Sequence, residues 1–192
     1  MTRLGEGKVR HKVQTNTPSR SRSGKRSTKA SRNLLKQLGK LNLGETVIVG
    51  IGNALKGDDG AGPKVCSILK GKIAAEVIDA GTTPENYIGR LVRMSPKKLL
   101  IIDAIDFGSP PGTLKIFSAQ DLQQFTLSTH CLSPHLFVQA IISEIDTEVF
   151  FIGIQPAQLQ FGQGLSKQVA GASAALADDI ELILSHTGRP RD

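Results

Sequence analysis

The sequence predicts a single α/β domain of three layers, with a twisted, mostly parallel five-stranded sheet between helices. Five short apolar segments, rich in leucine or β-branched residues, alternate with segments of helical pattern. Near-continuous apolar strands are typical of a parallel sheet that helices cover on both faces. The chain has 192 residues, of which 39% are hydrophobic, and this suits one domain with a sizeable core.

The first half of the domain contains three of the predicted strands. Strand 46–51 runs into a glycine-rich turn, after which a helix is predicted at about 60–71. Strand 75–79 ends at an aspartate and is followed by a turn into a helix at about 85–94. Strand 98–103 is a run of leucine and isoleucine that also ends at an aspartate. The carboxyl ends of strands in such a sheet line a common crevice, so a carboxylate site is predicted there.

The second half begins with a strand that departs from the parallel pattern. Only a short loop precedes strand 113–117, and because it cannot hold a crossover helix, this strand is predicted to be antiparallel at an edge. Helices at about 119–125 and 132–145 precede the last strand, 148–154. In the closing helix, 166–185, apolar residues recur at spacings of three and four and form one face: Val169, Ala172, Leu176, Ile180 and Ile183.

The positive charge of the chain is concentrated at its start. The net charge is +7, yet residues 1–40 alone carry 12 Lys or Arg and one acid, a net charge of +11. The rest of the chain, which contains the predicted domain at 41–188, carries 12 basic and 16 acidic side chains. The first segment has few large apolar side chains and is predicted to be a disordered extension. It could contact nucleic acid or an acidic partner, or simply be solvated.

The cysteines and the apolar segments bear on where the protein works. Cys66 falls in a predicted helix and Cys131 in a loop, without the spacing of a secreted disulfide framework. No run approaches the roughly 18 consecutive apolar residues that span a bilayer. The basic start lacks the apolar segment of a secretory signal. The sequence therefore predicts a cytoplasmic protein without membrane spans.

The turn after the first strand carries the first candidate site residues, Asp58 and Asp59. Five glycines surround it, and glycine permits the backbone conformations of an exposed loop. Acids at a helix N-terminus cap free N–H groups, so one of the two is expected to cap the helix and the other to point into the crevice. A dinucleotide site is the alternative, but Leu55 takes the place of the third glycine of G-x-G-x-x-G. Two carboxylates there would also repel a pyrophosphate.

A second carboxylate and an imidazole come from other segments. Asp103 ends the third strand, and His130 lies in a polar loop ahead of an apolar helix. Together with an acid of the first turn, they form a mixed oxygen and nitrogen set that suits nickel, zinc or iron. Capping or turn formation is the alternative role for Asp103, and also for Asp79 and Asp106.

Short motifs follow one another along the chain in a recognisable order. They are Gly52-Asn53, Gly57-Asp58-Asp59-Gly60-Ala61-Gly62-Pro63, Ile78-Asp79-Ala80-Gly81-Thr82-Thr83-Pro84-Glu85-Asn86, Leu100-Ile101-Ile102-Asp103-Ala104, Asp106-Phe107-Gly108, Pro111-Gly112, Thr129-His130 and Phe151-Ile152-Gly153-Ile154-Gln155-Pro156. In this order and spacing, over roughly residues 45–185, the chain resembles the [NiFe]-hydrogenase maturation endopeptidases. The likeness is strongest to the branch that processes the large subunits of formate-hydrogenlyase-type hydrogenases.

The resemblance implies a cytoplasmic endopeptidase that removes a C-terminal extension from a [NiFe]-hydrogenase large-subunit precursor after nickel insertion. It also implies that Asp59, Asp103 and His130 contact the metal and form the catalytic site. The nickel would be carried by the substrate rather than kept as a cofactor, and the enzyme would belong to the aspartic-type class. The basic segment 1–40 has no counterpart in typical members of the family.

Two other functions are alternatives to this one. A nickel checkpoint or assembly factor would bind the same precursor without cutting it, so the mass of the precursor would not change. A nucleic-acid-binding protein would depend on the basic extension, and its affinity would fall steeply with salt. The sequence contains only seven Phe and one Tyr, which disfavours stacking on bases.

Overall fold

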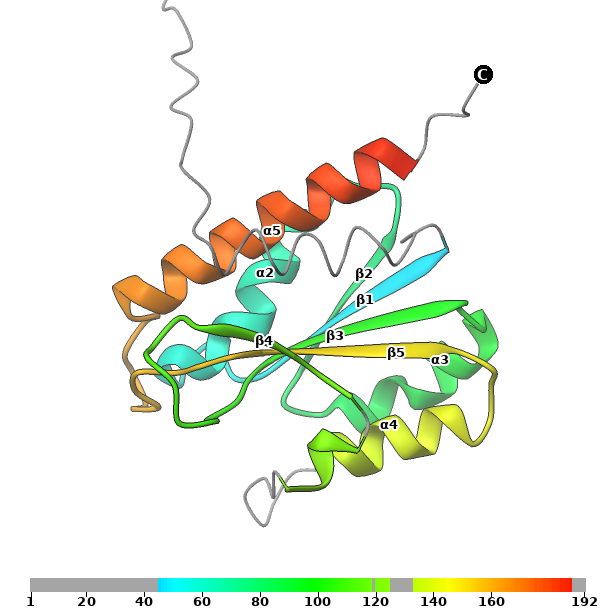
Figure 1. Ribbon diagram of the computed structural model, residues 1–192, viewed down its shortest axis with the longest axis horizontal. Helices are drawn as coiled ribbons and strands as arrows, with labels where there is room; N and C mark the ends of the chain where they lie inside the picture. Colours follow the sequence, from blue (N-terminus) through cyan, green and yellow to red (C-terminus); the bar gives the residue numbers. More distant parts are fainter. Residues whose placement is uncertain (1–44, 119, 125–132, 188–192) are drawn as a thin grey trace, which may run out of the picture.

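The structure is a computed structural model, and it describes residues 45–118, 120–124 and 133–187 (Figure 1). Its centre is a five-stranded, mostly parallel sheet. The strands are β1 (Thr46–Ile51), β2 (Glu76–Gly81), β3 (Lys98–Ala104), β4 (Leu114–Phe117) and β5 (Glu148–Ile154). They lie side by side in the order β2-β1-β3-β5-β4. Among the residues described, β4 pairs with β5 alone and runs antiparallel to it, which confirms the predicted edge strand.

Helices cover both faces of the sheet (Figure 1). The α-helices are α2 (Ala61–Leu69), α3 (Ile88–Met94), α4 (Pro134–Ile142) and α5 (Lys167–Thr187). Short 3-10 helices lie at η1 (Gly57–Gly60), η2 (Pro84–Tyr87) and η3 (Asp121–Gln124). α2 and α5 pack on one face, and α3 and α4 pack on the other. The predicted three-layer α/β fold is confirmed.

Each central strand contributes to two hydrophobic cores. In β1, Ile48 belongs to the core under α2 and α5, whereas Val47 and Val49 belong to the core under α3 and α4. Successive side chains of a strand point to opposite faces of the sheet. Because both faces are covered, every position is buried, and the strand has a continuous apolar sequence rather than an alternating one.

The apolar face predicted for the closing helix is confirmed in α5. Val169, Leu176 and Ile180 are fully buried in the core that α5 shares with α2, and Ala172 and Ile183 are partly buried against it. Full burial of a valine, leucine or isoleucine side chain contributes about 1.5–3 kcal/mol. This apolar face therefore holds α5 on the sheet.

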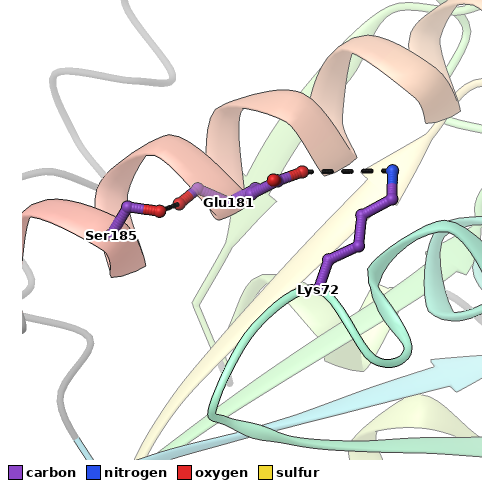
Figure 2. A network of polar contacts seen from close by, with 3 residues as sticks. All are labelled: Lys72, Glu181 and Ser185. Carbon is purple, nitrogen blue, oxygen red and sulfur yellow. Dashed lines mark hydrogen bonds and ion pairs between the residues drawn. The ribbon is translucent and has the colours of Figure 1, made fainter.

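Polar contacts on the outer side of α5 add little to this attachment (Figure 2). The ammonium of Lys72 lies 4.0 Å from the carboxylate of Glu181, and both side chains are partly exposed. One turn later, the hydroxyl of Ser185 donates a hydrogen bond to the backbone carbonyl of Glu181 at 2.7 Å. An exposed ion pair of this kind contributes at most about 1 kcal/mol.

Some element boundaries differ from the prediction. The helix predicted at about 60–71 is α2, and the 3-10 helix η1 lies directly ahead of it. The helix predicted at about 85–94 is divided into η2 and α3. Thr83, before η2, has φ −130° and ψ 61°, and Pro84 then starts the 3-10 turn. α3 ends where Ser95 adopts a left-handed conformation. The helix predicted at 119–125 is only the short η3 within the residues described, and α4 is shorter than the predicted 132–145.

The predicted basic extension, 1–40, lies outside the described residues, so its disorder and the domain limits 41–188 stay predictions. Over the ranges that the structure describes, none of the helices combines the length and the apolar character needed to cross a membrane.

Candidate active site

The candidate site lies where the connections of the sheet change direction. β1 pairs with β2 on one side and with β3 on the other, both in parallel. The chain therefore leaves the carboxyl ends of β1 and β3 toward opposite sides of the sheet. Ligands of open α/β sheets bind in the crevice at such a switch point. Gly52 follows β1 and Asp103 lies near the end of β3, so both occupy this position.

Glycines allow η1 and α2 to lie directly on the ends of these strands. A Cβ atom on Gly62 would lie 2.5 Å from the carbonyl oxygen of Ile102 and would also collide with the carbonyl oxygen of Ile51. Gly52 has φ +130°, and a Cβ atom there would collide with the carbonyl oxygen of Asp59. Side chains cannot occupy these positions without backbone movement. The close approach brings Asp59 to the end of β3.

Asp59 is half-buried in η1 and is held by the turn that precedes it. Its Oδ2 atom accepts a hydrogen bond from the backbone N–H of Asn53 at 2.8 Å. The amide oxygen of Asn53 in turn accepts from the N–H of Leu55 at 2.9 Å. The orientation of the Asp59 carboxylate is thus fixed by the first residues after β1.

Asp103 is nearly inaccessible, at 3% exposure, and its Oδ1 atom accepts the N–H of Ala104 at 2.7 Å. Burial and, secondly, repulsion from Asp59 raise the pKa of Asp103 well above its usual range, while the Ala104 hydrogen bond opposes this. Two carboxylates therefore interact at the switch point. Such a pair favours a bound cation or a retained proton, and both are useful in hydrolytic chemistry.

Asp58 has a different role from the one that the sequence predicted. Neither Asp58 nor Asp59 caps α2, because its N-cap is Gly60 and no side chain accepts a capping hydrogen bond there. Instead, the fully buried Asp58 carboxylate accepts three backbone N–H groups from the segment after β5: those of Ala157, Gln158 and Ser166. The capping prediction is therefore wrong for both acids. Asp59 does lie at the carboxyl end of the sheet.

The third predicted site residue, His130, lies outside the described residues, as does Cys131. The structure therefore leaves the position of the imidazole open. Within the ranges it does describe, no group of three or more His, Cys, Asp or Glu side chains is placed to hold a metal ion. Asp59 and Asp103 are the two predicted site residues that the structure brings together.

Gln155 holds the loop after β3, a role that the sequence did not predict. It is buried after β5, and its Oε1 atom accepts the N–H groups of Phe107 and Ser109 at 2.9 and 3.1 Å. Its amide nitrogen donates to Asp106 at 2.9 Å, and this contact lowers the pKa of the Asp106 carboxyl, with help from the N–H of Gly108. Asp106 thus organises the loop after β3, as one of its predicted roles required.

Asp79 and Cys66 make local structural contacts and do not belong to the acid pair formed by Asp59 and Asp103. Asp79 is exposed, and its Oδ1 atom accepts the N–H of Gly81 at 3.1 Å in a local turn. The buried thiol of Cys66 donates to the carbonyl oxygen of Ile78 at 3.4 Å. Burial, and then the nearby Asp79 charge, raises the pKa of Cys66 to about 12, so this thiol is no nucleophile at neutral pH.

Comparison with known proteins gives a consistent result. A family model described as hydrogenase maturation protease matches residues 64–185. The hydrogenase 3 maturation protease of Escherichia coli K12 is 34% identical over 142 residues, which cover 70% of this chain and 88% of that protein. A putative hydrogenase maturation protease of Methanocaldococcus jannaschii is 35% identical over 149 residues, or 73% of this chain and 94% of that one.

A solved structure agrees with these sequence matches. The crystal structure of a [NiFe] hydrogenase maturation protease from Thermococcus kodakarensis KOD1 has a TM-score of 0.72 and 28% identity. The match covers 78% of this chain and 99% of that one. The sequence matches and the shared sheet with its covering helices support a peptidase, and the chain belongs to the hydrogenase maturation protease family.

Proposed function

We propose that this protein is an endopeptidase that removes the C-terminal extension of a [NiFe]-hydrogenase large-subunit precursor after nickel has been inserted. Membership of the family supports the peptidase activity and the link to hydrogenases. The single observation that carries the site assignment is the carboxylate pair, with the buried Asp103 repelled by Asp59 at the switch point. We place the reaction in the cytoplasm, which the sparse cysteines of the sequence predict.

The proposed role of the pair is to recognise the nickel that the precursor carries. A divalent cation between Asp59 and Asp103 would relieve their repulsion and would favour the ionised form of Asp103. His130, which precedes α4 in the sequence, would supply a nitrogen ligand. The nickel is part of the substrate, so the enzyme would need no metal of its own. Precursor without nickel would lack the group that docks at the pair.

These three residues are also the proposed catalytic group of an aspartic-type enzyme. A carboxylate that holds a proton above its usual pH range is suited to general acid and base work on a peptide bond. The nickel would hold the scissile segment against these groups, and this positioning would supply much of the rate enhancement. The identity of the group that activates water is left open.

The test is the intact mass of a nickel-loaded large-subunit precursor after incubation with the protein, beside the same precursor without nickel. We expect loss of a C-terminal peptide only from the loaded form. Asp59→Asn, Asp103→Asn and His130→Gln should abolish the cleavage, whereas Asp79→Asn, in an exposed turn, should retain it. Complex formation without any mass change would replace the protease assignment with a checkpoint factor.

A further inference from the structure

Two loops next to Asp59 expose large apolar side chains. The first loop, 53–57, follows β1 and includes the first residue of η1, and the second, 156–164, lies between β5 and α5; together they are called the paired loops here. Leu55 in the first loop is 64% exposed. In the second loop, Leu159 is 43% exposed and Phe161 is 71% exposed. Figure 1 shows both loops at the end of the sheet where β1 and β5 finish.

Backbone hydrogen bonds join the paired loops into one unit. The N–H of Gly162 donates to the carbonyl oxygen of Leu55 at 2.8 Å, and the N–H of Gly57 donates to that of Gln163 at 3.0 Å. The contact is so close that a Cβ atom on Gly57 would lie 2.8 Å from the carbonyl oxygen of Gln158. Leu55 and Phe161 therefore lie beside the same backbone contact.

The Asp58 carboxylate fixes this unit to the candidate active site. Its oxygens accept the N–H groups of Ala157 and Gln158, near the start of the second loop, and of Ser166, which follows that loop. Asp59 is the next residue in the chain. The exposed apolar side chains are thus carried on a backbone held in place beside the acid pair, so little loop-ordering entropy would be lost on binding.

The composition of the second loop indicates what kind of surface it contacts. Residues 156–164 contain no charged side chain, while the chain outside the basic segment carries 12 basic and 16 acidic residues. In the first loop Leu55 is followed by the half-buried Lys56. Leu159 and Phe161, whose own loop has no charged side chain, favour an apolar protein surface over an anion or a nucleic acid. A second copy of this chain fits less well, because a partner seated beside Asp59 would obstruct the substrate.

We propose that the paired loops dock an apolar surface of the hydrogenase large-subunit precursor beside its nickel site, with Leu55, Leu159 and Phe161 as anchors. The proposal rests on the proposed function, since it takes the precursor as substrate. In this arrangement the acid pair recognises the metal, and the paired loops recognise the protein around it. Binding energy away from the reacting bond then contributes to selecting the precursor.

The test compares cleavage of a nickel-loaded precursor, from the organism that encodes this chain, by the full-length protein and two variants. Leu159→Ser combined with Phe161→Ser removes two anchors that are already exposed. We expect KM to rise about tenfold or more while kcat stays within about twofold, since central apolar anchors carry much of the affinity of an interface. The control is Leu182→Ser on α5, which is 52% exposed and distant from the paired loops in the chain; neither constant should change.

The outcomes separate the docking proposal from the proposed function. If the unaltered protein cleaves the precursor and the double variant does so with the same KM, the docking assignment is wrong and the protease assignment stands. If the unaltered protein does not cleave, both assignments fail. Self-association of the unaltered protein that the double variant abolishes, with KM unchanged, would identify the paired loops as a contact between copies and would overturn the proposal.

Discussion

The carboxylate of Asp58 accepts a hydrogen bond from the backbone N–H of Ser166, 108 residues further along the chain, at 2.6 Å. With its bonds to Ala157 and Gln158, this contact connects the loop after β1 to the loop after β5. Asp58 therefore joins the segment that carries Asp59 to the segment that begins α5. The adjacent acids have divided roles: one holds the structure of the site, and the other belongs to its chemistry.

The first prediction concerns the stability that Asp58 supplies. Asp58→Ala leaves three backbone N–H groups without their acceptor in a buried region, and each such loss costs about 1–3 kcal/mol. We expect the free energy of unfolding to fall by about 3 kcal/mol or more, measured by urea denaturation at pH 7. Asp58→Asn should cost less, because the amide keeps one oxygen acceptor.

The control for this prediction is Asp79→Asn. Asp79 is an exposed acid that accepts one local N–H, so its replacement should change the free energy of unfolding by no more than about 0.5 kcal/mol. Equal effects of Asp58→Ala and Asp79→Asn would show that the Asp58 contacts do not hold the two loops together.

The second prediction uses the raised pKa of Asp103. An acid whose pKa is higher in the folded state than its ordinary 3.8 retains its proton after the unfolded state has lost it. Stability then falls as pH rises above about 4, with a slope of up to about 1.4 kcal/mol per pH unit, until the folded group also ionises. Asp103→Asn removes this penalty, so the variant should be more stable than the unaltered protein at pH 7 while lacking activity.

Asp106→Asn is the control with the opposite sign. Hydrogen bonds from Gln155 and Gly108 lower the pKa of Asp106, so its contribution to stability is present above about pH 4 and is lost as pH falls through the folded pKa. Urea denaturation between pH 4 and 8 should therefore show Asp103→Asn to be more stable than the unaltered protein and Asp106→Asn to be less stable. A pH-independent loss of stability in Asp103→Asn would contradict the assignment of a buried, repelled carboxyl.

The third prediction compares two helical glycines. A Cβ atom on Gly62 would collide with the carbonyl oxygens of Ile51 and Ile102, whereas one on Gly171 of α5 meets nothing within 4 Å. Gly62→Ala should cost about 3 kcal/mol or more, in line with severe overpacking. Gly171→Ala should stabilise the protein by about 0.5–1 kcal/mol through lower backbone entropy of the unfolded chain. Thermal unfolding of the two variants tests both directions.

The sequence was sufficient to predict the sheet but not every contact at its end. Continuous apolar runs marked the strands, and an apolar periodicity marked α5, so Val169, Leu176 and Ile180 could be placed in the core in advance. The role of Asp58 could not be found in this way, because its partners are backbone groups about 100 residues away and no side chain marks them. Gln155 was missed for a similar reason, since its contacts are mostly with loop backbone.

The fourth prediction is that Cys66 resists alkylation in the folded protein. Its thiol is buried, donates to the carbonyl oxygen of Ile78, and has its pKa raised to about 12, so at pH 8 almost none is in the reactive thiolate form. After treatment with iodoacetamide, peptide mapping should find Cys66 unmodified in the native state and fully modified in urea. Cys66→Ala should keep peptidase activity, whereas rapid native labelling of Cys66 would show that α2 separates readily from β2. Since Gly50 and Gly62 bring this helix close to the sheet, such separation would also release η1 and with it the position of Asp59.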